Sequence, residues 1–282
     1  MLLAIDVGNS NTVLGLYRLV AAAEPETSQR FSPELHATWR ITTPEARTLD
    51  EFGVLLRSLF ELGGIDISQI TGVAISSVVP PIDATLRQVC ERFFKLRPLF
   101  VEPGVKTGLP VLIDNPAEAG ADRICNCVGA FERFGGPCII VDMGTATTFD
   151  VVSAKGEFLG GAIAPGLGIS ADALFTHAAR LPRIEVRKPA KVIGTGTVDN
   201  IQIGLYYGYI GLVDGILERM IKRMQVDLPA GTPVQTIMTG GLGKLIAAGC
   251  RYVTEVDDNL TLTGLRIIFE RNSERHRKRN EK

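Results

Sequence analysis

The chain lacks an excess of charge of either sign, and it lacks long apolar runs. Its 30 basic residues are balanced by 31 acidic ones, which leaves a formal net charge of −1. A chain so balanced has no global field to attract nucleic acid or an anionic membrane surface. No stretch reaches the roughly 18 uninterrupted apolar residues that a membrane-spanning helix needs. We therefore expect neither nucleic acid nor a membrane among its partners.

Cysteine and histidine are scarce, and neither has the spacing of a metal or redox site. They are Cys90, Cys125, Cys127, Cys138, Cys250, His36, His177 and His276. Only one residue separates Cys125 from Cys127, unlike a C-x-x-C pair. We interpret the cysteines as reduced core thiols. The apolar start has no basic segment before it and ends at Asp6, so we expect no secretory signal and a cytoplasmic protein.

Several common motifs of nucleotide-binding and hydrolytic enzymes are also absent. There is no G-x-x-x-x-G-K-[ST] segment, because Gly243-Lys244 lacks the upstream glycine and is followed by leucine. The glycine-rich segments at 194–199 and 241–246 lack the last glycine of the dinucleotide fingerprint. No G-x-S-x-G nucleophile elbow exists. These absences exclude the P-loop, the NAD or FAD fingerprint and the serine hydrolase elbow.

Short β-rich apolar runs alternate with longer segments of helical period, which is typical of α/β architecture. Strands are predicted at 2–6, 13–18, 36–42, 70–78, 98–102, 138–142, 147–153, 157–163, 234–239 and 252–256. Helices are predicted at 49–62, 81–94, 117–133, 168–180, 198–225, 242–248 and 260–276. The low-complexity stretch 20–34 predicts a hairpin loop or a disordered insertion.

Four glycines in the segment 201–217 recur at helical spacing. Gly204, Gly208, Gly211 and Gly215 would lie on one face of a helix. Glycines on such a face let another backbone approach closely. The partner is either another helix of the same chain or a second subunit, and the sequence does not choose between them.

One turn sequence occurs twice. "DVGNSNT" at 6–12 returns as "DMGTATT" at 142–148, with Asp, Gly and Thr in the same first, third and seventh places, 136 residues apart. Each copy follows an apolar strand and enters another. Two halves built as strand, Asp-Gly turn, strand, turn and strand indicate a duplicated domain.

The residue types in this turn suit a phosphate. A turn of Gly, Asn, Ser and Thr presents backbone N–H groups and hydroxyls, which hold phosphate oxygens without a full positive charge. A carboxylate at the strand end binds a hydrated Mg²⁺. The alternative for one copy is a plain Asp-Gly hairpin turn. Two copies at corresponding places favour a pair of loops that grip the β- and γ-phosphates of a nucleotide.

Asp122 and Arg123, in "DNPAEAGADRICN" at 114–126, are the candidates for chemistry. Phosphoryl transfer needs positioning, charge neutralisation and a base near the acceptor hydroxyl. Asp122 would take the hydroxyl proton, and Arg123 would bind an anionic substrate group or the transferring phosphoryl. The alternative is a helix-surface ion pair of little energetic worth.

In these segments the chain resembles the type III pantothenate kinases. That family belongs to the superfamily of acetate and sugar kinases, heat-shock chaperones and actin. The resemblance covers nearly the whole chain. It runs in the family's order through "DVGNSNT", "RTLDEFGVLL", "DNPAEAGADR", "DMGTATTFDVV", "GEFLGGAIAPGL", "IQIGLYYG" and "MTGGLG".

The resemblance implies two ribonuclease-H-like domains of the actin-like ATPase type, 1–115 and 116–282, with mixed sheets flanked by helices and the active site between the domains. It implies ATP-dependent phosphorylation of the primary hydroxyl of pantothenate, the first step toward coenzyme A, in a homodimer. The implied cofactors are ATP, Mg²⁺ and a monovalent cation, K⁺ or NH₄⁺.

The family's site residues carry over by motif. The ATP phosphates and the divalent ion would be bound by Asp6, Val7, Gly8, Asn9, Ser10, Asn11, Thr12 and Val13, and the second phosphate side by Thr145. Asp142 would hold the monovalent cation. The pantothenate site would be lined by Gly120, Ala121, Asp122, Arg123 and Thr197, with Asp122 as proton acceptor and Arg123 on the carboxylate.

Two positions depart from the family pattern. Ile113 stands where a tyrosine is common, and Thr195 stands where a basic residue is more frequent. Neither change removes a proposed catalytic group. The sequence leaves two alternatives to a pantothenate kinase: a catalytically silent nucleotide-binding regulator of the same fold, and a kinase for another small hydroxy acid.

Overall fold

The structure is a computed structural model that describes residues 1–19, 34–43 and 47–280. All but the last residue of the stretch 20–34 lies outside the described residues. The chain divides into two compact units. The first comprises Met1–Gly108, Ala117–Gly129 and Thr261–Lys282, and the second comprises Leu109–Pro116 and Ala130–Leu260. Within the described part of the chain, no helix is long and apolar enough to cross a membrane.

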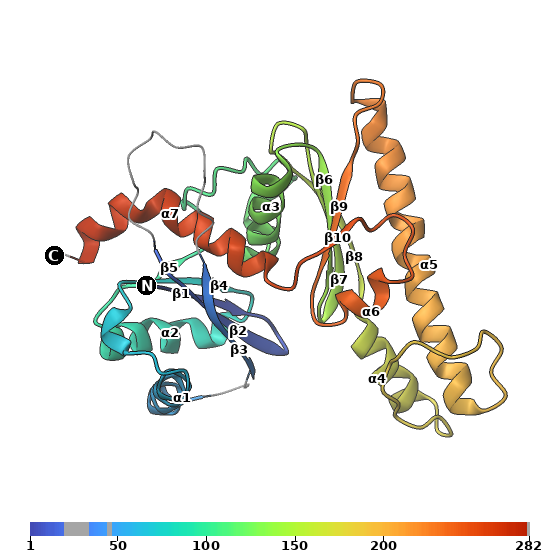
Figure 1. Ribbon diagram of the computed structural model, residues 1–282, viewed down its shortest axis with the longest axis horizontal. Coiled ribbons are helices and arrows are strands. Elements are labelled where there is room, and N and C mark those ends of the chain that lie inside the picture. Colours follow the sequence, from blue (N-terminus) through green and yellow to red (C-terminus); the bar gives the residue numbers. More distant parts are fainter. Residues whose placement is uncertain (20–33, 44–46, 281–282) are drawn as a thin grey trace. The chain divides into compact units, whose positions relative to one another are not determined.

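The first unit is built on a five-stranded mixed sheet with the order β3-β2-β1-β4-β5 (Figure 1). Its strands are β1 (Leu2–Val7), β2 (Asn11–Tyr17), β3 (Leu35–Thr42), β4 (Gly72–Ser77) and β5 (Leu99–Phe100). β1, β2 and β3 form an antiparallel meander, and β4 and β5 extend the sheet in parallel with β1. β1 is buried almost throughout, because a central strand covered on both faces reads as a continuous apolar run.

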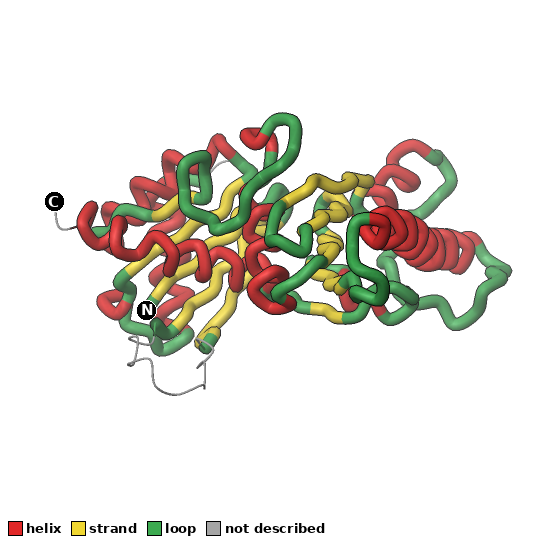
Figure 2. The backbone as a smooth tube through the Cα atoms, turned by 90° about the horizontal axis from the view of Figure 1, so that it is seen from above, coloured by secondary structure: helices red, strands yellow, loops and turns green. Residues whose placement is uncertain are grey.

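Helices cover both faces of this sheet (Figure 2). They are α1 (Leu49–Leu62), α2 (Pro80–Val89) with a π-helical continuation (Cys90–Phe94), and α7 (Leu260–Asn280); a 3₁₀ turn spans Ile67–Gln69. Thr48 and Glu51 form the capping box that begins α1. From α7, the side chains of Leu262 and Phe269 pack where Gly15 and Gly72 leave room on the sheet.

The second unit repeats the plan with the order β10-β9-β6-β7-β8 (Figure 1). The strands are β6 (Cys138–Met143), β7 (Ala146–Val152), β8 (Phe158–Pro165), β9 (Gln235–Thr239) and β10 (Glu255–Val256). The helices are α4 (Leu167–His177), α5 (Thr197–Val226) and α6 (Gly243–Ala247). Again three strands form an antiparallel meander and two are parallel to the first of them.

A 3₁₀ turn (Pro116–Glu118) precedes α3 (Ala121–Phe134), whose residues up to Gly129 belong to the first unit. Near its start α3 meets α7 closely. A Cβ placed on Gly264 would lie 1.8 Å from the carbonyl oxygen of Cys125, and Thr261 Oγ1 donates to Asn126 Oδ1 at 2.7 Å. Glycine is required at 264 because the two backbones touch there.

The predicted α/β class, the ten strands and the seven helices are confirmed. The predicted strands 98–102 and 252–256 shrink to two residues each, because both lie at sheet edges, where short strands limit unwanted pairing. The predicted helix 117–133 begins only at Ala121, after the 3₁₀ turn. The compact units do not coincide with the expected division 1–115 and 116–282, since Thr261–Lys282 belongs to the first unit; that division into domains stays a prediction.

Candidate active site

The first predicted phosphate turn joins β1 to β2. Gly8 N donates to Asn11 O at 3.0 Å and closes the turn, while Val7 pairs with Thr12 in the strand register. The side chains of Asn9, Ser10 and Asn11 are exposed, and Asp6 is half-buried at the end of β1. The turn therefore presents its backbone and short polar side chains to the outside, with one carboxylate at its base.

Thr43, the residue after β3, holds this turn by three hydrogen bonds. Its amide donates to Ser10 O at 3.0 Å. Its hydroxyl donates to Gly8 O at 2.7 Å and lies 2.9 Å from Thr12 Oγ1. Thr12 itself is only 1% exposed. The Thr12 hydroxyl is therefore shielded from solvent and contacts the hydroxyl of Thr43.

Asp122 lies in the first turn of α3, directly after Gly120 and Ala121. Its Oδ1 accepts the amide of Arg123 at 2.7 Å. A Cβ on Gly120 would lie 2.6 Å from that same Oδ1, so the absence of a side chain at 120 makes room for the carboxylate. Burial raises the pKa of Asp122 above its ordinary value, and the Arg123 amide and guanidinium only partly offset this.

Asp6 and Asp122 lie in the same neighbourhood of the first unit. The negative charges of both carboxylates act on the completely buried thiol of Cys125. Its pKa is raised well above the ordinary value, first by burial and then by Asp6 and Asp122. Val78 contacts both segments: its amide donates to Val7 O at 3.0 Å, and its Cγ1 lies 3.7 Å from where a Cβ on Gly120 would be.

The second predicted turn joins β6 to β7 in the second unit. Its carboxylate, Asp142, is surrounded by glycine backbone. A Cβ on Gly240 would lie 2.7 Å from Asp142 Oδ1, and one on Gly144 would lie 3.4 Å from it. Thr145 is exposed at the tip. Gly166 packs against the turn, because a Cβ there would lie 2.1 Å from Thr145 O.

The remaining predicted substrate residues lie in the second unit. Thr197 is exposed and begins α5. Ile113, one of the two departures, lies beside β8, with Cγ2 3.4 Å from where a Cβ on Gly160 would be. At the other departure, Thr195 Oγ1 accepts a hydrogen bond from Lys191 Nζ at 2.9 Å. A basic group thus contacts position 195 from four residues upstream.

The donor set fits a hydrated divalent ion. Among the described residues, no group of three or more His, Cys, Asp or Glu side chains converges on one point. Asp6 therefore offers one carboxylate and no protein cage. Mg²⁺ is commonly held by one or two carboxylates, with water and substrate phosphates filling the remaining positions.

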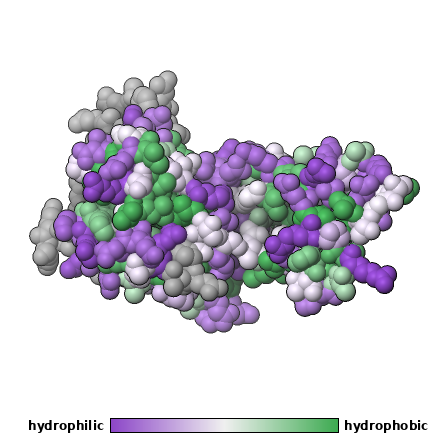
Figure 3. Space-filling view, turned by 90° about the horizontal axis from the view of Figure 1, so that it is seen from below, coloured by the Kyte–Doolittle hydropathy of each residue, from purple (hydrophilic) through white to green (hydrophobic). Residues whose placement is uncertain are grey.

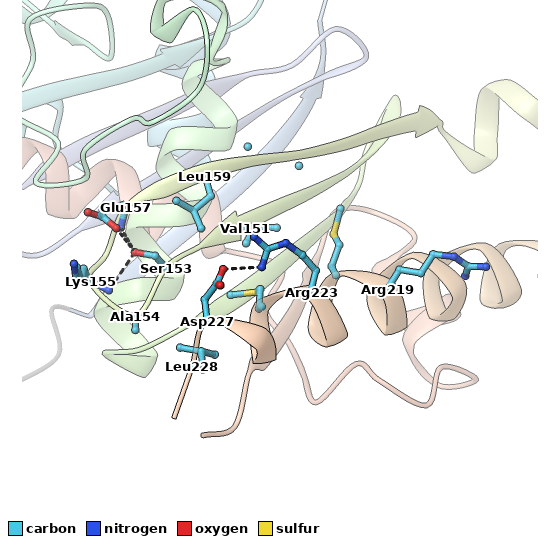
Figure 4. A pocket seen from close by; sticks show the side chains of 14 residues that line it. Val151, Ser153, Ala154, Lys155, Glu157, Leu159, Arg219, Arg223, Asp227 and Leu228 are labelled. Carbon is cyan, nitrogen blue, oxygen red and sulfur yellow. Dashed lines mark hydrogen bonds and ion pairs between the residues drawn. The ribbon is translucent and has the colours of Figure 1, made fainter. Parts of the chain in front are cut away.

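A cavity of about 570 Å³ in the second unit holds none of the predicted site residues (Figure 4). The end of the β7–β8 hairpin and the C-terminal half of α5 line it. Val151, Leu159 and Met220 are among its apolar residues. At its rim Arg223 donates to Asp227 at 2.6 Å. The cavity opens at the opposite end of β7 from the Asp142 turn and lies outside the candidate site.

The structure brings Asp6 to Val13 together with Gly120 to Arg123 in the first unit, and it places Asp142 and Thr145 on one turn of the second. Thr43 is not among the residues predicted from the sequence. A single threonine after a strand has no motif, and only the pairing of β2 with β3 shows that it reaches the turn.

Comparison with known proteins gives one consistent result. The family model described as "Type III pantothenate kinase" matches residues 2–219. Proteins of that name from Koribacter versatilis and Acidobacterium capsulatum are 60% identical over 279 residues and 57% identical over 270. The alignments cover 99% and 96% of this chain, and 98% and 94% of the relatives.

Solved structures show the same fold at lower identity. A Campylobacter jejuni protein assigned to the Baf family of transcriptional activators matches with a TM-score of 0.59 and 19% identity, over 96% of this chain and 99% of its own. A Sinorhizobium meliloti protein assigned as a 2-dehydro-3-deoxygalactonokinase matches with a TM-score of 0.56 and 12% identity, over 96% and 99%. At such identity these matches bear on the fold alone, and the first lends no support to a regulatory function.

Proposed function

The chain belongs to the type III pantothenate kinase family, and from this membership we propose that it transfers the γ-phosphoryl group of ATP to the primary hydroxyl of pantothenate. The product is 4'-phosphopantothenate, the first step toward coenzyme A. One observation supports the assignment to particular residues: Val78 contacts both segments, since its amide donates to Val7 O at 3.0 Å and its Cγ1 lies 3.7 Å from where a Cβ on Gly120 would be. A base therefore lies close to the turn proposed to hold the phosphates. Because ATP is the donor, we place the reaction in the cytoplasm.

The turn from Asp6 to Val13 holds the phosphates through its backbone N–H groups and the exposed side chains of Asn9, Ser10 and Asn11. Asp6 holds Mg²⁺, which neutralises phosphate charge when bound. The hydroxyl of Thr12 is engaged with Thr43, so we assign to Thr12 a contact through its backbone. In the second unit we assign Thr145 to the phosphates and Asp142 to a monovalent cation, K⁺ or NH₄⁺.

Asp122 is the general base of the proposed reaction. Oδ1 is occupied by the Arg123 amide, so we assign the proton of the acceptor hydroxyl to Oδ2. Burial raises the pKa of this carboxyl, which brings it nearer the value at which proton acceptance is efficient at neutral pH. Arg123 then binds the pantothenate carboxylate as a charge-assisted pair. Gly120, Ala121 and Thr197 line the pantothenate.

Asp122→Asn tests this role. The variant keeps the shape of the side chain but accepts no proton, so we expect turnover to fall by about 10²–10⁴-fold, with nucleotide affinity unchanged. Asp50→Asn, an exposed acid on α1, is the matched control and should behave as wild type. Turnover within threefold of wild type in Asp122→Asn would remove the proposed base.

The function itself is tested by coupled ADP release with and without pantothenate, in potassium and again in sodium. ADP release that depends on pantothenate and is faster in potassium supports acceptor, donor and cation together. Nucleotide binding without formation of phosphopantothenate would favour a silent binding protein instead.

We also propose that the protein forms a homodimer and that the two subunits meet along α5, which we call the seam. A Cβ on Gly204, Gly208 or Gly211 would meet no described atom of the chain within 4 Å, so no described helix uses this face for packing inside the subunit. Tyr207 on the same face is 38% exposed. Other large apolar residues of the second unit are also exposed, on α4, β8 and the segment before α5: Ile163, Ile169, Leu174, Phe175, Val192 and Ile193. Figure 3 shows hydrophobic surface (green) among hydrophilic residues on one face.

Sedimentation tests the seam. Gly208→Arg would place a long charged side chain on the glycine face, and we expect it to convert a dimer into a monomer. Val226→Arg, at the far end of α5 and 77% exposed, is the control and should stay dimeric. A Gly208→Arg variant that remained a dimer would move the seam elsewhere.

A further inference from the structure

The structure points to a positioning residue outside the recognised motifs. We propose that Thr43 fixes the Gly8–Asn11 turn in the shape that binds nucleotide phosphates, and that it does so without touching the nucleotide. The inference rests on the proposed nucleotide site, and it concerns a residue that lies beyond both "DVGNSNT" and "GADR".

The strand register brings Thr43 to the turn. β3 pairs antiparallel with β2, and Asn11 faces Thr42. Thr43, the first residue after β3, therefore lies opposite Ser10, which belongs to the turn. There its amide donates to Ser10 O at 3.0 Å. A residue 31 positions after Thr12 thus becomes part of the turn's support.

The hydroxyls form a directed chain. The Thr43 hydroxyl has one proton, which it donates to Gly8 O at 2.7 Å. Its 2.9 Å contact with Thr12 Oγ1 must then use the Thr12 proton. The order is Thr12 O–H to Thr43 O–H to Gly8 C=O. Hydrogen bonds in such a chain strengthen one another in a buried setting, and Thr12 is 1% exposed.

These bonds set the direction of two backbone N–H groups. The described chain has no cis peptide bonds, and in a trans peptide plane the C=O and the following N–H point in opposite directions. Since the carbonyls of Gly8 and Ser10 point toward Thr43, the N–H groups of Asn9 and Asn11 point away from it. Thr43 therefore orients the donors that the proposed function assigns to the phosphates.

The second turn shows that this support is particular to the first. At the offset of 136 residues Ser10 corresponds to Ala146, which pairs with Pro165. Proline stands where Thr43 stands in the first unit, and it has neither an N–H nor a hydroxyl to donate. The bond pattern is therefore absent from the second turn, although the turn sequence is repeated.

The test compares three variants. Thr43→Val keeps the branched shape and the amide bond but removes both hydroxyl bonds and leaves Gly8 O without its donor. Thr43→Ser keeps the hydroxyl. Thr42→Val, an exposed threonine one residue earlier, removes a hydroxyl from the outer side of the same strand end and serves as the control.

The measurement is binding of a non-hydrolysable ATP analogue with Mg²⁺ by calorimetry without pantothenate, followed by steady-state kinetics and thermal unfolding. We expect Thr43→Val to weaken binding, and to raise the KM for ATP, by about tenfold. The KM for pantothenate should stay within twofold. Thr43→Ser should recover most of the affinity, and Thr42→Val should match wild type.

Each outcome decides the matter. Wild-type affinity in Thr43→Val overturns the inference. So does an equal loss of ATP and pantothenate affinity that follows a fall in melting temperature, because that marks a general structural role. If wild type binds the analogue but does not phosphorylate pantothenate, pantothenate is not the acceptor. The binding affinities of the Thr43 variants still test the role of Thr43 in that case. A wild-type chain that bound no nucleotide would overturn both.

Discussion

The two Asp-Gly turns have matching sequences and matching strands around them, yet they are held by different means. In the first unit the turn is fastened by hydrogen bonds from Thr43 to Gly8 and Ser10. In the second, Pro165 occupies the corresponding register, and the next residue, Gly166, presses its bare backbone against Thr145 O and Gly144 O. A repeated motif therefore predicts where a turn lies but does not predict how the protein supports it.

The difference extends to the equivalent threonines. Thr12 uses its hydroxyl on Thr43, within the turn's support. Thr148, its counterpart, donates to Asp150 Oδ2 at 3.2 Å, along its own strand. The first turn thus depends on side-chain hydrogen bonds, and the second depends on the absence of side chains. Each arrangement fails under a different kind of substitution.

Among changes within the two turns, the largest effect is expected when the carboxylates of Asp6 and Asp142 are exchanged for amides. Asp6→Asn should lower turnover by about 10²–10³-fold, because it removes charge that stabilises the metal and the transferring group. Asp142→Asn should instead abolish the difference between potassium and sodium. ADP release in the two salts measures both. An Asp142→Asn enzyme that still preferred potassium would contradict the division of roles.

Gly166→Ala should destabilise the second unit. Its Cβ would lie 2.1 Å from Thr145 O and 2.6 Å from Gly144 O, and overpacking of this kind costs about 1–3 kcal/mol. Gly168→Ala is the matched control, since a Cβ there meets no described atom within 4 Å, and alanine favours the α4 helix by up to about 1 kcal/mol. Urea unfolding compares the two. Equal midpoints would show that the close approach at 166 is of no consequence.

Thr148→Val should have a smaller effect on nucleotide binding than Thr43→Val. Its hydroxyl contacts Asp150 and does not fasten the turn, so we expect the dissociation constant of the ATP analogue to change by less than about threefold. Calorimetry on both variants under one set of conditions gives the answer. A larger loss in Thr148→Val would reverse the proposed contrast between the turns.

The smallest effect concerns stability and pH at Asp122. Because burial raises the pKa of this carboxyl above its unfolded value, the folded state holds the proton more tightly. Its stabilising contribution is therefore present at low pH and is lost as pH rises through the folded pKa. Asp122→Asn should then unfold at the same or a higher urea concentration than wild type at neutral pH, with the difference vanishing in acid. A variant less stable than wild type at neutral pH would contradict the burial argument.

Much of this architecture follows from the sequence, because the alternation of apolar runs and helical periods is local. The predicted helix 49–62 coincides with α1, and the repeat of the turn placed β1, β2, β6 and β7. The family resemblance is confirmed by the family model and the relatives. The site residues at Asp122 and Asp142 stay predictions that the geometry supports.

What the sequence did not predict depends on contacts between distant residues. The packing of Gly264 against Cys125 joins residues far apart in the chain and places α7 in the first unit. The support by Thr43 depends on the register of β3 against β2. Neither the period of an apolar pattern nor a motif contains such a pairing.

The position of α7 in the sequence has a consequence for folding during synthesis on the ribosome. Residues that begin the chain form the first sheet, but the helix that covers one of its faces is encoded at the other end. The first sheet is therefore synthesised early but is covered by α7 only late. The stretch from Ala130 to Leu260 needs no later segment to form the second unit. A nascent chain therefore carries uncovered apolar surface on its first sheet until the residues of α7 have been synthesised, and such surface is prone to aggregation.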